Sequence, residues 1–435
     1  MPETKDRVRC SSETEKCRNG VQMGRVAFLA FVAALGGILF GYDTAVVSGT
    51  TAAVAEKFSL DAIAKGWYVG CALVGSICGV AAAGWLSDRF GRKPAMLFSS
   101  VLFSVSAIGC ALCIGFADLV LYRIVGGVGI GIVSIVSPVY ISEISPAGKR
   151  GTMVALYQFA ITLGFVLAYL VNYLLLVNVH VSELWRVMLG AEAVITLLFF
   201  AVIFFIPESP RWLALRSEGG RVTRRIPWGE LLRPGIVKAV AIGCAIAVLG
   251  QFMGVNAVLY YGPDIFADAG LAAKDSSFST VLVGLVNMVS TVAAVFLVDR
   301  VGRKALVYFG VSAMIACLVA TAMFFRLHVA GFAFVAVFLA YIASQAVSVS
   351  AVVFILLSEM YPDKVRGVAM SIAGLALWVG TYLVGQFTPW CMASFGPSGT
   401  FFLFAAMCLP YLFIIWRLVP DTTGKSLEEV EAYWN

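Results

Sequence analysis

Twelve apolar runs, each about as long as a membrane is thick, dominate this sequence. A helix needs about 20 mainly apolar residues to cross the hydrocarbon core of a bilayer, and runs of that length alternate with short polar connections. We expect membrane-spanning helices near residues 26–48, 66–84, 95–114, 119–142, 152–174, 186–206, 236–262, 278–298, 305–325, 333–358, 368–391 and 398–418. The sequence therefore predicts an all-α, twelve-helix protein whose surroundings are the lipid bilayer.

Composition argues against enzymatic and nucleic-acid-binding classes. Charged residues make up only 13% of the chain, about half of the share in soluble domains. The net charge of +6 is spread over loops and the N-terminal tail, a pattern that indicates membrane topology and no nucleic-acid partner. Most cysteines lie inside apolar runs, and the two histidines, His180 and His328, fall in short loops. We therefore expect no metal site, no cofactor and no catalytic residues.

The polar intervals divide the chain into five parts. Residues 207–235 form the longest polar interval after the tail and separate six expected helices from six. Basic clusters occur in loops on one side of the predicted helices, which places that side in the cytoplasm. We expect an N-terminal cytoplasmic tail, a six-helix bundle, a short cytoplasmic linker, a second six-helix bundle and a C-terminal cytoplasmic tail, at 1–25, 26–206, 207–235, 236–418 and 419–435. The expected location is the cell membrane. A polar tail before a full first span argues against a cleaved signal peptide.

The two halves repeat each other. The loop at residues 84–93 recurs at 298–304, each copy with an Asp-Arg-x-Gly-Arg-Lys core. An acid followed seven residues later by an arginine occurs at Glu143 and Arg150, and again at Glu359 and Arg366. Paired motifs at one offset predict a duplicated six-helix unit, with a pseudo-two-fold axis along the membrane normal.

Several motifs together resemble those of one transporter family. They are the two Asp-Arg-x-Gly-Arg-Lys loops, Pro-Glu-Ser-Pro-Arg-Trp-Leu from residue 207, Pro-Asp-Thr-Thr-Gly-Lys from residue 420, and Gly-Tyr-Asp-Thr-Ala-Val-Val-Ser-Gly from residue 41. With them the chain, from about residue 26 to 428, resembles the sugar porter family of the major facilitator superfamily. Bacterial proton-coupled xylose and hexose symporters and animal glucose facilitators belong to that family. The resemblance implies the major facilitator fold, with a central cavity that opens alternately to each side.

Charged residues of the repeated motifs are expected at the cytoplasmic ends of the helices. Ion pairs there can close the cytoplasmic side, because breaking a partly buried pair costs about 3–5 kcal/mol. The candidate gate residues are Asp88, Arg89, Arg92, Glu143, Arg150, Glu208, Arg211, Asp299, Arg303, Glu359 and Arg366. The alternative is that some of these charges, above all the outermost arginines, serve only as insertion signals.

Three charges fall inside the predicted membrane spans, where each is costly. Asp43 lies about 17 residues into the first span, roughly 25 Å from its inner end at 1.5 Å per residue. Arg123 and Glu192 each follow soon after the outer end of an inward-running helix, so all three reach one depth. An acid facing a guanidinium can alternate between a salt bridge and a protonated, released carboxyl. We interpret Asp43 as the proton carrier; a permanent structural pair is the alternative, and Glu192 is also open to a role in helix contacts.

The resemblance implies a sugar site of amides and aromatic rings. Amides pair with hydroxyl groups, and rings stack on the apolar face of a sugar. The candidate sugar ligands by motif position are Gln158, Gln251, Asn256, Asn287, Phe354 and Trp378. The chain departs from the family at Phe165, Gly250 and Leu377, where amides are usual, and at Phe354, where the family has Trp. These departures argue against assuming glucose or xylose, and a buried amide can instead tie helices together.

The sequence thus predicts a proton symporter of a small sugar or related polyol that acts as a monomer. A uniporter of the same substrates is the first alternative. A non-transporting sugar sensor is the second, and a multidrug facilitator, which leaves the motifs unexplained, is the third.

Overall fold

The computed structural model describes the chain except residues 1–2, 147–149, 218–227, 363–364 and 420–435. Side chains of 3–23, 25, 150–151, 215, 228, 299 and 358 are also outside the description. The described residues form helices and no strands: α1 (Glu3–Val46), η1 (Val47–Gly49), α2 (Thr51–Lys57), α3 (Ala62–Phe90), α4 (Arg92–Leu112), α5 (Phe116–Ile144), α6 (Arg150–Asn178), α7 (Leu184–Gly190), α8 (Glu192–Ile203), α9 (Pro210–Ser217), α10 (Trp228–Leu231), α11 (Pro234–Phe252), α12 (Val255–Asp268), α13 (Ala273–Val301), α14 (Arg303–Leu327), α15 (Phe332–Gln345), η3 (Ala346–Ser350), α16 (Ala351–Met360) and α17 (Arg366–Arg417).

Eleven helical segments of the described chain are long and apolar enough to cross a membrane. The last, α17, has 52 residues and would be about 78 Å long if it were straight, far beyond the roughly 30 Å of bilayer hydrocarbon. It is not one helix, because Gly396 interrupts it with φ 72°, a conformation that glycine adopts readily. Counting its two arms separately gives twelve spans, and the predicted all-helical membrane fold is confirmed.

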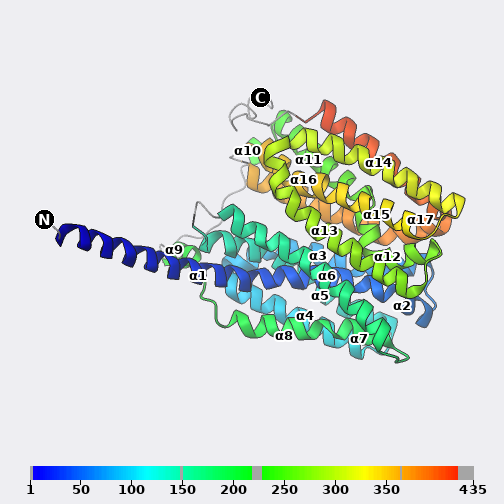
Figure 1. The fold of residues 1–435 in the computed structure, drawn as a ribbon, viewed down its shortest axis with the longest axis horizontal. Helices are drawn as coiled ribbons and strands as arrows, with labels where there is room; N and C mark the ends of the chain where they lie inside the picture. Colours follow the sequence, from blue (N-terminus) through cyan, green and yellow to red (C-terminus); the bar gives the residue numbers. More distant parts are fainter. Residues whose placement is uncertain (1–2, 147–149, 218–227, 363–364, 420–435) are drawn as a thin grey trace.

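The helices gather into two bundles (Figure 1). In the first, α3 packs on α5, α1 on α6 and α4 on α5; in the second, α11 and α14 pack on α17. The bundles meet where α3 contacts α17 and α6 contacts α13. The short helices α9 and α10 lie at one end, which we call the linker end, and α2 and α7 lie at the opposite, distal end.

Glycines allow the helices that carry the site to approach each other closely. A Cβ on Gly79 of α3 would lie 2.9 Å from the Cα of Gly131 on α5, and one on Gly164 of α6 would lie 3.0 Å from the Cα of Gly41 on α1. Small residues at these crossings let backbones touch, as is usual between helices in lipid. The contacts hold α1 between α5 and α6, next to the centre of the molecule.

Two helices of the second bundle are interrupted near mid-length. Between α11 and α12 the chain turns at Met253 and Gly254, where Gly254 has φ 91°. The Tyr341 hydroxyl donates to the Met253 carbonyl over 2.8 Å and so satisfies a backbone group that the break releases. Between α15 and α16 a five-residue π-helix, η3, widens the spiral. Irregular backbone at this depth is tolerated where it is buried in protein or lines a cavity.

Candidate functional site

A cavity of about 190 Å³ lies between the bundles. Its walls come from α1 and α6 on one side and from α11, α12, α13, α15, η3 and α17 on the other. Five of the predicted sugar ligands line it: Gln158, Gln251, Asn256, Asn287 and Trp378. The fold therefore brings together amides from four different helices around one space.

Two amides of the second bundle, Gln251 and Asn256, are hydrogen-bonded to each other. Asn256 Nδ2 donates to Gln251 Oε1 over 2.5 Å. The Thr381 hydroxyl lies 3.3 Å from the same oxygen and 3.0 Å from the Leu377 carbonyl, so its one hydrogen is shared between them. With its carbonyl occupied, Gln251 presents its NH₂ group as a donor, and Asn256 keeps its carbonyl as an acceptor. Gln158, from the first bundle, is exposed. This arrangement offers both donors and acceptors, as a molecule with many hydroxyl groups requires.

An aromatic pair from opposite bundles adds an apolar surface to the cavity. The rings of Phe40 on α1 and Trp378 on α17 are stacked, with centroids 5.7 Å apart and planes 27° apart. Phe354, the predicted counterpart of a stacking Trp, is not among the lining residues and is 49% exposed. It lies four residues after Ser350, one helical turn nearer the linker end. Phe354 therefore does not line this cavity in the described state, and its stacking role stays a prediction.

Of the three positions where the family usually has an amide and this chain does not, two line the cavity and one does not. Phe165 and Leu377 line the cavity, so apolar side chains do replace amides there. Gly250 does not line it, and a Cβ at this residue would face Val349 at 3.4 Å and Tyr411 at 3.7 Å. The side chain of a glutamine at position 250 would therefore leave the backbone toward the packed interior of the second bundle and not toward the cavity.

Among the polar residues of the cavity wall that sequence analysis missed, two pair with each other. Gln345 ends α15 and Ser350 ends η3, and both line the cavity. The sequence did contain a signal for Gln345, because it lies in the middle of the predicted 333–358 span. A membrane span rarely buries a polar side chain that has neither a partner nor a function.

The three predicted membrane charges meet on the first bundle. Arg123 Nη1 on α5 donates to Asp43 Oδ1 on α1 over 3.0 Å, and Glu192, the first residue of α8, interacts with both. All three are buried, with exposures of 1% for Asp43 and 2% for the other two. Within the described part of the chain, neither Asp43 Oδ2 nor Glu192 Oε1 has a recorded hydrogen-bond partner. The depth argument thus placed together three groups that are far apart in sequence.

The acid cluster adjoins the central cavity. A small void of about 10 Å³, near the minimum for one water, is lined by Asp43 and Arg123. Thr44 and Tyr260 line both this void and the cavity. Because two side chains form a shared wall, an occupant of the cavity lies one residue away from the carboxyl.

At the linker end of the first bundle, a glutamate and an arginine form a buried pair. Arg92 donates through Nε and Nη2 to the two oxygens of Glu143 over 3.1 and 3.0 Å, and through Nη1 to Asp88 over 3.1 Å. The Ser209 hydroxyl donates to Glu143 over 2.6 Å. Glu208 accepts from the backbone N–H of Arg92 over 2.9 Å and so caps α4 where its dipole favours an anion. The Pro-Glu-Ser-Pro-Arg-Trp run thereby fixes the start of the linker to the α3–α4 turn.

The remaining gate candidates are more loosely placed or lie outside the description. In the second bundle Arg303 donates to Glu359 over 3.1 Å, and Arg366 donates to the Tyr361 carbonyl over 3.2 Å. Arg89 lies over the rings of Trp85 and Phe90, and Arg211 is exposed. The side chains of Arg150 and Asp299 are outside the described part of the chain. The ion pairs recorded at this end therefore each lie within one bundle.

At the distal end, by contrast, polar contacts cross between the bundles. Lys65 Nζ on α3 lies 2.7 Å from Asp264 Oδ2 on α12. Gln386 Nε2 on α17 donates to the Ile63 carbonyl over 3.0 Å, and the Tyr169 hydroxyl on α6 donates to the Leu259 carbonyl over 2.8 Å. The described structure is therefore joined across its distal end.

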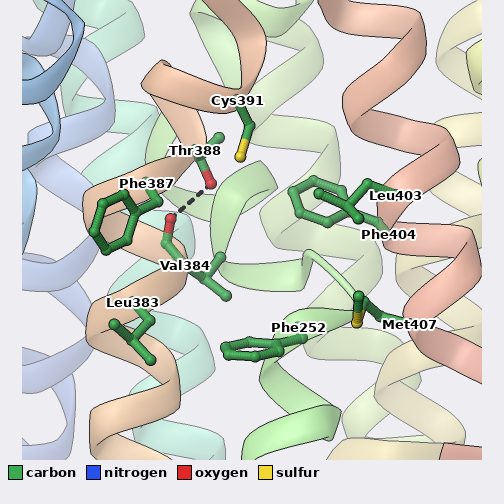
Figure 2. Close-up of a pocket in the computed structure, with 9 residues that line it drawn as sticks. All are labelled: Phe252, Leu383, Val384, Phe387, Thr388, Cys391, Leu403, Phe404 and Met407. Atoms are coloured by element: carbon green, nitrogen blue, oxygen red, sulfur yellow. Dashed lines mark hydrogen bonds between the residues drawn. The ribbon is translucent and has the colours of Figure 1, made fainter. Parts of the chain in front are cut away.

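A second pocket of about 270 Å³ has a different chemistry (Figure 2). Phe252 on α11 and residues from both arms of α17 surround it. The Thr388 hydroxyl faces this pocket, but it already donates a hydrogen bond to the Val384 carbonyl over 2.7 Å. The lining residues thus offer little to a sugar, and the cavity between the bundles is the candidate substrate site.

Comparison with known proteins agrees with this geometry. The family described as "Sugar (and other) transporter" matches residues 29–225 and 214–434. The chain belongs to this sugar porter family. This sugar porter is 36% identical to the arabinose-proton symporter of Bacillus subtilis, over 95% of this chain and 96% of that protein. It is 35% identical to the D-xylose-proton symporter of Escherichia coli, over 93% and 95%.

Solved structures show the same architecture. The xylose transporter from E. coli, in a structure described as inward open, superimposes with a TM-score of 0.83 and 33% identity, covering 94% of this chain and all of that one. The sugar porter is therefore a multi-pass membrane transporter with the major facilitator fold, and not an enzyme.

Proposed function

We propose that this sugar porter couples the entry of one small sugar or related polyol to the entry of a proton. The observation that carries the proposal is the buried cluster of Asp43, Arg123 and Glu192, which shares two wall residues with an amide-lined cavity. Proton symport in the arabinose and xylose relatives supports it.

The charge of the cluster explains how it can carry a proton. Two carboxyl groups face one guanidinium, so the buried cluster is electrically neutral when it holds one proton. An uncompensated buried charge is costly, and the proton must therefore arrive or leave when water reaches the site. Asp43 is the proposed carrier, because it borders the void that adjoins the cavity.

The size of the cavity indicates the substrate class. A volume of about 190 Å³ lies below the roughly 300–1,000 Å³ of sites for drug-sized ligands, which favours a substrate as small as a monosaccharide. Hydrogen bonds from Gln158, Gln251, Asn256 and Asn287 would hold hydroxyl groups, while Trp378 would cover the apolar face.

Alternating access follows from the two bundles, with 26–206 and 236–418 as the moving units. Contacts that cross at the distal end, together with an exposed Gln158, support a state open toward the linker end. The positive-inside pattern supports a cytoplasmic linker and termini. The proposed location is the cell membrane, and in the described state the cavity opens toward the cytoplasm.

The proposal is tested in proteoliposomes with radiolabelled pentoses, hexoses and polyols. We expect counterflow of at least one of them, and its accumulation when the medium is acidic relative to the lumen. Counterflow without accumulation would make the protein a uniporter, with Asp43–Arg123 a structural pair. Exchange of cationic drugs but of no sugar or polyol would refute the substrate class.

The distal contacts make a separate prediction. Lys65→Glu should repel Asp264 and favour opening of the distal end, and Lys65→Glu with Asp264→Lys should restore the parent behaviour. Because the side chains are 26% and 18% exposed, we expect a shift of about threefold, near 0.6 kcal/mol. Labelling of a cysteine introduced at the distal end measures the shift.

The matched control is Lys57→Glu, which disrupts the pair of Lys57 with Glu183, also 2.7 Å long but within the first bundle. Equal labelling changes in Lys57→Glu and Lys65→Glu, or no recovery in the charge-swapped double variant, would show that the Lys65 pair does not hold the halves together.

A further inference from the structure

Gln345 and Ser350 form a polar pair in the wall of the central cavity. Gln345 Nε2 donates to Ser350 Oγ over 2.9 Å, and Ser350 Oγ lies 3.1 Å from Gln345 Oε1, to which it can donate. Gln345 is only 3% exposed, yet it lines the cavity with Ser350. Its amide therefore meets the cavity over a small area, next to the exposed Ser350.

The π-helix creates the pair. In an α-helix two residues five positions apart are separated by about 140° around the axis, so their side chains do not meet. The wider turn of η3, from Ala346 to Ser350, returns the chain to the same face after five residues. Such single π-turns recur at functional sites, and here the turn places a hydroxyl against an amide at the cavity wall.

The pair retains unused hydrogen-bonding capacity. An amide NH₂ has two donors and its carbonyl two lone pairs, and the bonds to Ser350 use one of each. One N–H and one acceptor position remain on Gln345. A sugar hydroxyl can occupy one of these positions, either accepting from Nε2 or donating to Oε1.

We propose that Gln345, positioned by Ser350, is a hydroxyl-binding subsite that sets the specificity of this chain. The inference rests on the proposed function and deepens it. Leu377 places an apolar side chain in the cavity where the family pattern has an amide, and Gln345 supplies an amide from a different helix. The substrate is then a monosaccharide or polyol recognised through a hydroxyl that faces α15 and η3.

The test is transport of arabinose, xylose and their monodeoxy analogues by the purified protein in proteoliposomes. Gln345→Leu should raise the half-saturation concentration of the best substrate about tenfold, the loss expected when one well-formed hydrogen bond is removed. One deoxy analogue, lacking the bound hydroxyl, should be transported equally by parent and variant. Ser350→Ala should show the same selectivity pattern with a smaller change, since it leaves the amide in place.

Ser348→Ala is the matched control. Ser348 belongs to the same π-helix and donates to the Ser344 carbonyl, but it does not line the cavity. It should leave every half-saturation value unchanged. If Gln345→Leu and Ser350→Ala weaken all analogues equally, or none, the pair is structural and the inference is overturned. If the parent transports no sugar or polyol at all, the proposed function itself fails, a result distinct from either.

Discussion

Asp43→Asn is expected to retain sugar counterflow and to lose uphill accumulation. The amide resembles a protonated carboxyl in shape and charge, so both bundles can rearrange without a proton. One proton moving through about 100 mV supplies roughly 2.3 kcal/mol, enough for about 50-fold accumulation of a neutral sugar. The variant should equilibrate sugar and accumulate none, and substrate should no longer cause alkalinisation of the medium.

Glu192→Gln is the matched control for this prediction. It removes the second carboxyl of the cluster but leaves the 3.0 Å contact between Asp43 and Arg123. We expect it to weaken accumulation without abolishing it, because the cluster is then neutral without a proton but Asp43 still borders the void beside the cavity. If Asp43→Asn still concentrates sugar in a pH-dependent way and Glu192→Gln does not, the carrier is Glu192. If Asp43→Asn is inactive even in counterflow, the pair with Arg123 is structural.

Glu143→Gln is expected to destabilise the protein strongly. The carboxylate receives two bonds from Arg92 and one from Ser209, and the pair is buried, with side-chain exposures of 7% and 6%. Removing one member of a buried pair costs about 3–5 kcal/mol, and the contact that Arg92 keeps, with the 42% exposed Asp88, should offset only part of this loss. The measurement is thermal unfolding of the purified protein in detergent.

The internal duplication provides the control, Glu359→Gln. Its pair with Arg303 has one recorded bond and side-chain exposures of 22% and 23%, so we expect a smaller loss, on the order of 1 kcal/mol. Equal losses at Glu143 and Glu359, or none at Glu143, would contradict the prediction.

The gate hypothesis makes a further prediction for the same residue. If the cluster also holds the cytoplasmic side closed in another state, Glu143→Ala should increase labelling of cysteines introduced on the cytoplasmic side. Unchanged labelling from both sides would leave the cluster with a bracing role inside the first bundle.

The sequence determined the spans and the depths of the charged residues. Apolar runs have to match the bilayer thickness, which is why the predicted 368–391 and 398–418 spans correspond to the two arms of α17 on either side of Gly396. A rise of 1.5 Å per residue likewise put Asp43 and Arg123 at one level, and the structure joins them. Family motifs located amides that line one cavity.

Only the tertiary structure decided which faces meet. The depth of Gly250 was predictable, but its direction toward Val349 and Tyr411 depends on how α11 packs. Glu208 caps a helix that begins 116 positions earlier in the chain, a contact with no local sequence pattern. The pairing of Gln345 with Ser350 depends on a π-turn, and helical periodicity assumes that no such turn occurs. Period and length are local properties of a helix, whereas orientation and pairing depend on neighbours that are distant in sequence.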